Sequence, residues 1–358
     1  MAAPSATERP AGGAVKPALR HLARRLAWAA LIVVGVGTVA FFLSRALPGD
    51  PTRMLLGPQA RPADVAQARR IYGLDRPIHE QYVLFWTRLV HRAPAAASPP
   101  RDHRSCAALP LGLHLDLGHS FRYRRPVVQL LIEKAPRSLE LAAAGLLLQI
   151  LLGLGAGLVS ARWRGTWADQ LSIGATLVGV SAPTFLLGLC LQYVLAHQLR
   201  WLPFDGYGST PAEHLQSLVL PALTLGVFGA ALYARLTRDE LSSALSADYV
   251  RTARAKGAGE ARVLVVHGLR NALIPVVTLL VLDFGTLVGG AVVTERLFRW
   301  PGLGSMAVDA LINRDGPVVF GTVLFAATAI VLATLLLDVV YALLDPRLRR
   351  RRASSSGR

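Results

Sequence analysis

SADYVRTARAKGAGEARVLVVHGLRNALIPVVT, residues 246–278, is the stretch on which the interpretation of the whole chain rests. It carries Arg251, Arg254, Lys256, Arg262 and Arg270, and it lies between two long apolar runs. Arginine and lysine accumulate in the short loops on the cytoplasmic side of a membrane. The stretch is therefore expected to be a basic cytoplasmic loop between two membrane spans.

Two short helices are expected within this loop. The carboxylate of Asp248 can cap a helix over residues 249–256 by accepting hydrogen bonds from the free N–H groups of its first turn. Gly257 is expected to end that helix, because glycine adopts the left-handed conformation of a helix C-terminus without a Cβ clash. A second helix is expected from Glu260 to Pro275, where the next apolar run begins. An ordinary solvated basic loop is the alternative interpretation.

The order of residues in this loop is similar to a known family. Residues 248–257 read DYVRTARAKG, and His267 and the sequence LRNALIP at residues 269–275 follow. They resemble the EAA loop, the cytoplasmic loop that docks on the ATPase in bacterial ABC-importer permeases, in the form of the dipeptide, oligopeptide and nickel branch. Arg251 stands where many such permeases have Glu, and Arg270 where many have Pro. The resemblance implies contact with the ATPase for Asp248, Tyr249, Arg251, Ala253, Arg254, Ala255, Lys256, Gly257, Arg270 and Asn271.

Composition points to a membrane protein. The 358 residues are 53% hydrophobic, with a mean hydropathy of +0.41 and a formal net charge of +17. A soluble domain would need an oversized core to bury so much apolar surface. The basic residues lie in the tails and between apolar runs, and no nucleic-acid-binding module is recognisable, so the charge is interpreted as setting membrane orientation. The surroundings of Cys106 and Cys190 favour neither a disulfide nor a metal site.

Six apolar runs are long enough to cross a bilayer. They predict an all-α, polytopic membrane protein, and the resemblance implies the type I ABC-importer permease core. Six spans place both termini and the short basic turns in the cytoplasm. A removable signal peptide ending near Ser44 is the alternative for the first run. The expected spans are residues 26–43, 139–159, 171–196, 218–234, 275–293 and 318–344.

The chain divides into successive regions around these spans. An amphipathic segment at 127–135 is expected before the second span, in which Gly153 and Gly157 are spaced for close helix contact. The resemblance covers about residues 19–347, apart from a Pro/Ala-rich insertion. The expected regions are a disordered cytoplasmic tail at 1–19, the first transmembrane helix at 20–45, an external region at 46–137 with the insertion at 91–110, a permease core of five transmembrane helices at 138–345 with the coupling loop at 238–274, and a basic cytoplasmic tail at 346–358.

Polar and helix-breaking residues in or near the spans are candidates for the solute pathway. Pro183 in the third span indicates a kink or a functional break, a kink being the commoner case. A charged Asp283 near mid-membrane costs at least about 2.5 kcal/mol, so it should face water, a partner group or the solute. Either it meets a positive charge on the solute, or it packs, protonated or hydrogen-bonded, against a partner. The candidates are Ser181, Pro183, Asp283, Gly289, Gly290 and Glu295.

No standard nucleotide site is present in the sequence. A P-loop needs Gly-Lys followed by Ser or Thr, whereas Lys16, Lys134 and Lys256 are followed by Pro, Ala and Gly. Zinc-protease and Gly-x-Ser-x-Gly patterns are absent as well. The sequence therefore predicts a transport subunit and not an enzyme, with no cofactor and no metal site.

The resemblance implies the permease subunit of a binding-protein-dependent ABC importer in the bacterial inner membrane, for a dipeptide, an oligopeptide or a related solute such as nickel or glutathione. Its implied partners are a second homologous permease in a heterodimer, cytoplasmic ABC ATPase subunits, an external solute-binding protein and membrane lipid, with no nucleic acid. The alternative class is an ion- or proton-coupled secondary transporter that uses Asp283. The loop at 246–278 favours the importer, because a secondary carrier needs no helix that docks on an ATPase.

Overall fold

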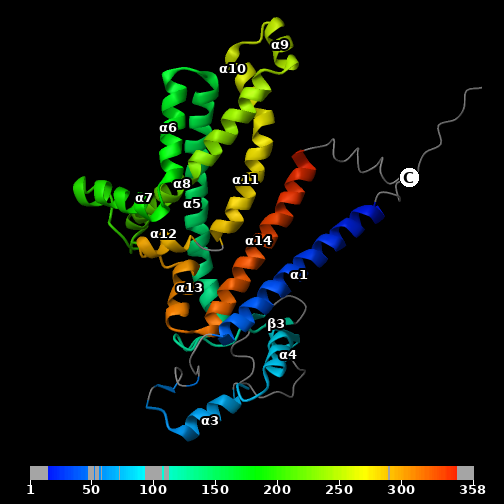
Figure 1. The fold of residues 1–358 in the computed structure, drawn as a ribbon, viewed down its shortest axis with the longest axis vertical. Coiled ribbons are helices and arrows are strands. Elements are labelled where there is room, and N and C mark those ends of the chain that lie inside the picture. The colour runs from blue at the N-terminus through cyan, green and yellow to red at the C-terminus, as the bar shows by residue number, and fades with distance from the viewer. Residues whose placement is uncertain are drawn as a thin grey trace, which may run out of the picture.

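Long helices dominate the computed structural model of this chain (Figure 1). It describes residues 15–46, 107–108, 113–288 and 291–344, and residues 52–92 apart from 53–55, 58 and 72. The predicted tail at 346–358 and most of the predicted tail at 1–19 and insertion at 91–110 lie outside these residues, as do Gly289 and Gly290.

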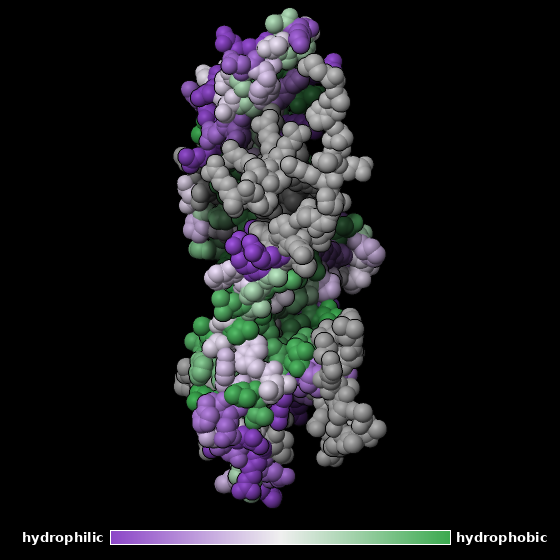
Figure 2. All heavy atoms as spheres, turned by 90° about the vertical axis from the view of Figure 1, so that its right-hand side faces the viewer, coloured by the Kyte–Doolittle hydropathy of each residue, from purple (hydrophilic) through white to green (hydrophobic). Residues whose placement is uncertain are grey.

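Four of the described helices are long and apolar enough to cross a membrane. On the face drawn in Figure 2, hydrophobic residues gather in a broad band between hydrophilic ends. Both observations agree with the predicted all-α membrane protein. The four helices are α1 (Val15–Ala46), α5 (Val127–Arg162), α8 (Pro211–Leu245) and α14 (Gly316–Leu344).

The third and fifth predicted spans are built from shorter helices. The third contains α6 (Trp167–Ser181), α7 (Thr184–Leu191) and the π-helical segment η3 (Gln192–Gln198). Helix α6 ends before Pro183, because proline lacks an N–H donor and disfavours helical geometry at the residue before it. The helix is therefore interrupted at Pro183, whereas the sequence analysis gave a simple kink as the commoner case. The fifth contains α11 (Arg270–Val288).

Helix α5 is longer than expected. The segment at 127–135, predicted to be separate, is the first part of α5, and Pro136 lies inside the continuous helix. Its residues Val127, Leu130 and Leu131 are buried in an apolar cluster with residues of α13 (Leu303–Ile312) and α14. This burial explains why the segment packs as part of the bundle.

Glycines let α5 and α8 approach closely. A Cβ atom on Gly153 would lie 2.4 Å from the Cβ of Tyr233, and one on Gly157 would lie 2.6 Å from the Cβ of Thr237. No real side chain fits at such distances. The predicted role of these two glycines in close helix contact is therefore confirmed, and α5 and α8 form a tightly packed pair.

A small region caps the end of the molecule opposite the loop at 246–278 (Figure 1). Phe41 of α1, Tyr82 and Phe85 of α4, and Phe320 of α14 pack together here, and the hydroxyl groups of Thr38 and Tyr82 are 2.8 Å apart. The strands form an antiparallel sheet in the order β1-β3-β2, which was not expected from the sequence. The elements are α3 (Pro62–Ile71), α4 (Ile78–Leu89), β1 (Val90–Arg92), β2 (Ala107–Ala108) and β3 (Leu113–Leu115).

The basic loop itself contains α9 (Asp248–Ala255), followed by α10 (Glu260–Arg262) and the π-helical segment η4 (Val263–Leu269). These last two run directly into α11, so the second helix of the loop continues through Pro275 to Val288 and does not stop at the proline. The loop and the membrane helix that follows it are thus one rod.

The coupling loop and the cavity beside it

Helix α9 begins one residue earlier than expected. Ala247 is its N-cap residue, and no side chain caps the helix. Asp248 is already helical, and its carboxylate is 99% exposed and 3.8 Å from the guanidinium of Arg251. The prediction that Asp248 caps the helix is therefore wrong. Its negative charge still lies in the first turn, where it is favourable to the helix dipole.

The end of α9 is as predicted. Gly257 has a φ of +81°, the left-handed conformation that a side chain disfavours. The N–H of Gly257 donates to the carbonyl of Arg254 at 2.9 Å, and that of Ala258 donates to the carbonyl of Ala253 at 3.1 Å. This pair of bonds is the Schellman pattern of a glycine-terminated helix. Gly257 is thus confirmed as the residue that ends α9.

Contacts within the loop fix α9 against the start of the rod. Val250 of α9 and Val263 of η4 are both fully buried. The guanidinium of Arg254 donates two hydrogen bonds to Glu260, at 2.8 and 3.2 Å, and these bonds lower the pKa of the Glu260 carboxyl. The hydroxyl of Tyr249 donates to the carbonyl of His267 at 3.3 Å. Helix α9 is therefore held on one face and open to a partner on the other.

Most of the residues that the resemblance assigns to ATPase contact are exposed. Ala253 is partly buried, and the side chain of Asn271 lies outside the described residues. The other eight are exposed: Asp248, Tyr249, Arg251, Arg254, Ala255, Lys256, Gly257 and Arg270.

An ion pair between a buried carboxylate and a partly exposed guanidinium joins the helices next to the loop. The guanidinium of Arg238 in α8 donates to both carboxylate oxygens of Asp169 in α6, at 3.0 and 3.1 Å. The N–H of Gly165 donates to the same carboxylate at 2.9 Å, and the hydroxyl of Ser160 in α5 donates to it as well. These hydrogen bonds, that from Arg238 above all, lower the pKa of Asp169. The cluster ties three helices together, and no sequence motif identified it.

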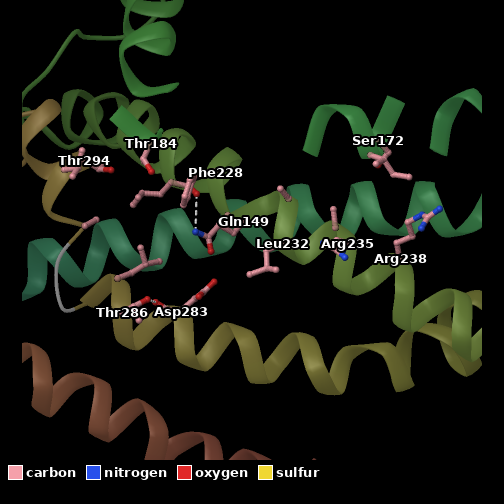
Figure 3. A pocket seen from close by; sticks show the side chains of 18 of the residues that line it. Gln149, Ser172, Thr184, Phe228, Leu232, Arg235, Arg238, Asp283, Thr286 and Thr294 are labelled. Carbon is pink, nitrogen blue, oxygen red and sulfur yellow. Dashed lines mark hydrogen bonds between the residues drawn. The ribbon is translucent and has the colours of Figure 1, made fainter. Parts of the chain in front are cut away.

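A cavity of about 960 Å³ opens along α8, as Figure 3 shows. Its lining comes from α5, α6, α7, α8, α11 and α12 (Val292–Leu297). Phe228 and Leu232 of α8 line it and stay 38% and 51% exposed. Its volume is that of a cavity for a small ligand.

Polar side chains from three helices lie in the lining of this cavity or directly against it. The hydroxyl of Tyr233 in α8 donates to the carboxylate of Asp283 in α11 at 3.0 Å. The amide of Gln149 in α5 donates to the carbonyl of Leu225 at 3.1 Å. The sequence analysis missed Gln149 and Tyr233, although a glutamine inside an apolar run was a usable signal.

The predicted pathway residues are not all brought together. Asp283 lines the cavity, whereas Ser181 and Pro183 are exposed at the break between α6 and α7 and do not line it. Glu295 is fully buried, where it accepts from the hydroxyl of Ser138 at 2.7 Å and from the N–H of Ser305 at 2.8 Å. These bonds fasten α12 to α5 and α13.

Comparison with known proteins places this architecture in a family. Residues 150–350 match the model of the binding-protein-dependent transport system inner membrane component, and residues 18–142 match the N-terminal model of the same components. The glutathione transport system permease proteins GsiC of Escherichia coli K12 and Salmonella typhimurium LT2 are 37% identical to this chain over 331 residues. The match covers 92% of this chain and 99% of each relative.

A solved structure shows the same fold. An inward-facing conformation of the MetNI methionine ABC transporter superposes with a TM-score of 0.51 at 18% identity, and the match covers 62% of this chain and 98% of that one. The family matches also decide against the secondary transporter. The chain therefore belongs to the binding-protein-dependent transport system inner membrane components, the multi-pass permease subunits of ABC importers, and it is a transport subunit and not an enzyme.

Proposed function

We propose that this permease conducts a peptide-like solute through the cavity along α8 and that α9 receives the closing movement of the ATPase. One observation carries the proposal: α10, η4 and α11 form an uninterrupted helical rod from the basic loop to Asp283 in the cavity lining. A rod transmits a displacement at one end as a rigid-body movement of the other. Docking of the ATPase on the exposed face of α9 would then reshape the cavity.

The cavity also supports a second permease as partner. Its lining is polar around Asp283 and Gln149 yet leaves Phe228 and Leu232 exposed. Lipid does not satisfy polar groups, so a protein surface is the favourable cover for this side of the molecule. We assign that role to a homologous permease, which makes the working unit a heterodimer with two ATPase domains and an external solute-binding protein.

The class of solute follows from the relatives and from cavity size. The GsiC proteins are named for glutathione, which is itself a peptide. A cavity of about 960 Å³ accommodates a di- or tripeptide. The described residues contain no group of three His, Cys, Asp or Glu side chains that suits a metal ion, so a peptide is favoured over nickel.

Reconstitution tests the proposal. The permease, its partner permease and their ATPases would be placed in proteoliposomes, and ATP hydrolysis and uptake of labelled glutathione and dialanine would be measured with the binding protein added outside. We expect uptake that requires ATP and the binding protein. Uptake that follows an imposed proton gradient and needs no ATPase would overturn the proposal, and so would ATP-driven uptake of Ni²⁺ without uptake of either peptide.

A further inference from the structure

Along α8, the hydrogen-bond acceptors of the cavity lie apart from its positively charged side chains. Figure 3 shows Gln149 and Asp283 pointing toward one another near one end, whereas Arg235 and Arg238 lie farther along toward Ser172. Arg238 is paired with Asp169. The region between Gln149 and Asp283 is thus lined by hydrogen-bond acceptors and lies away from the cations of the cavity.

The amide of Gln149 is held in one orientation. Its Nε2 group donates to the carbonyl of Leu225, and the whole residue is only 4% exposed. The amide fills the space beside Gly229, because a Cβ atom on Gly229 would lie 2.3 Å from the Cδ and Nε2 atoms of Gln149. The Oε1 atom is buried and accepts no hydrogen bond from the described residues. Such an unsatisfied buried acceptor is unfavourable unless a ligand supplies the donor.

Asp283 presents its carboxylate to the same space. One of its oxygens accepts from Tyr233, which is fully buried and can offer no second donor. No lysine, arginine or histidine among the described residues forms an ion pair with it. The carboxylate therefore keeps acceptor capacity on the side that faces Gln149.

A cationic donor satisfies this arrangement. A primary ammonium group carries three N–H donors and one positive charge, which match one carboxylate and one amide oxygen. The apolar side chains of Phe228 and Leu232 beside the pair lower the local dielectric and strengthen the attraction. We infer that Gln149 and Asp283 form a binding subsite for a protonated primary amine on the transported solute. The assignment to the solute rests on the proposed function of the cavity as its path.

Charge-selective cysteine modification tests the subsite without knowledge of the solute. Thr286 lines the cavity, is exposed and lies one helical turn after Asp283. Thr286→Cys would be made in the full chain with Cys106 and Cys190 replaced by serine. Its rates of modification would be measured with three methanethiosulfonate reagents, which carry a 2-aminoethyl group, an ethyl group or a 2-(trimethylammonio)ethyl group. Each rate would be divided by the rate at which the same reagent modifies a free thiol in solution.

The 2-aminoethyl reagent should react about tenfold faster than the ethyl reagent, an enhancement of the size that one nearby charge produces. Asp283→Asn should remove most of the enhancement for both cationic reagents, and Asp283→Glu should retain it. Gln149→Met should reduce the rate about threefold for the 2-aminoethyl reagent alone, because the trimethylammonium group has no N–H to donate. The control Thr184→Val removes a hydroxyl elsewhere in the cavity and should leave the ratios between the rates of the three reagents unchanged.

Three outcomes would overturn the subsite. The first is an equal ratio of the 2-aminoethyl rate to the ethyl rate in the parent Thr286→Cys protein and in Asp283→Asn, which would show that the carboxylate attracts no cation. The second is a parent ratio equal to that of the free thiol, which is the result expected if Asp283 is protonated and donates to Gln149. Protection by Ni²⁺ without preference for the 2-aminoethyl reagent would assign the oxygens to a metal ion. The measurement needs neither ATPase nor binding protein, so selective modification without ATP-driven uptake would keep the subsite and reject the proposed function.

Discussion

Single residues in the coupling loop act through backbone conformation more than through contacts. A Cβ atom on Gly257 would meet no atom within 4 Å, so space alone would allow any side chain there. The constraint is its φ of +81°, which L-residues adopt at a cost. Gly259, two residues later, also has open space around it but has an ordinary φ of −64°. The two glycines therefore form a matched pair.

Gly257→Val should abolish solute-stimulated ATP hydrolysis in the reconstituted complex, because the left-handed end of α9 becomes unfavourable by roughly 1–3 kcal/mol and the docking face is displaced. The variant should still insert in the membrane. Gly259→Val, the control, should hydrolyse ATP at nearly the wild-type rate. Normal stimulation in Gly257→Val would show that the helix end has no part in coupling.

Asp169 gives a second prediction at the residue scale. Its side chain is 5% exposed and holds Arg238, so Asp169→Asn should destabilise the permease by about 3 kcal/mol and lower its Tm in detergent. The control Asp239→Asn removes an exposed carboxylate from the same arginine and should change Tm little.

The lowered pKa of Asp169 fixes the direction of the pH dependence. A carboxyl whose folded pKa is below its unfolded value stabilises the fold above the unfolded pKa, and the contribution is lost as pH falls through the folded pKa. The Tm difference between wild type and Asp169→Asn should thus be constant near neutral pH and shrink below about pH 4. A difference that grows on acidification would contradict the role of the ion pair.

Elements differ in how far the sequence could define them. The glycine spacing in α5 and the glycine at the end of α9 were readable, because each depends on local geometry. The start of α9 at Asp248 and the course of the rod through Pro275 depend on packing against neighbours, which periodicity does not report. The short sheet β1-β3-β2 joins strands with little pattern of their own. Gln149 stood out in the sequence as a polar residue in an apolar run, but its partner, the carbonyl of Leu225, became known only when α8 was placed beside α5.

The close packing of α5 on α8 predicts unequal effects for two neighbouring glycines. Gly153→Ala would bring a methyl group to 2.4 Å from the Cβ of Tyr233 and 2.8 Å from the carbonyl oxygen of Ala230, so the helices must separate. We expect a loss of about 1–3 kcal/mol, seen as a lower Tm. Gly155→Ala places its methyl group in open space and should leave Tm unchanged or slightly higher. Equal Tm values for the two variants would refute the tight contact.

At the scale of the whole molecule, the helices separate two ends of different character. Figure 1 places α9 and α10 at one end and α3, α4 and β3 at the other. Family membership fixes a multi-pass inner-membrane permease, and the basic loop at 246–278 supports the orientation with α9 in the cytoplasm. In this predicted orientation, the end with α3 and α4 would be free to meet the binding protein, and the end with α9 would be free to meet the ATPases.

Accessibility of single cysteines tests this orientation. In a background with Cys106 and Cys190 replaced by serine, Thr166→Cys and Ala261→Cys lie at exposed positions of the two basic turns, and Asp75→Cys lies at an exposed position before α4. An impermeant maleimide added outside cells with a permeable outer membrane should label only Asp75→Cys. Disruption of the inner membrane should make the other two reactive, which controls for buried thiols. Labelling of Ala261→Cys in cells with an intact inner membrane would place α9 outside, where no ATPase reaches it, and would reject both the orientation and the coupling role.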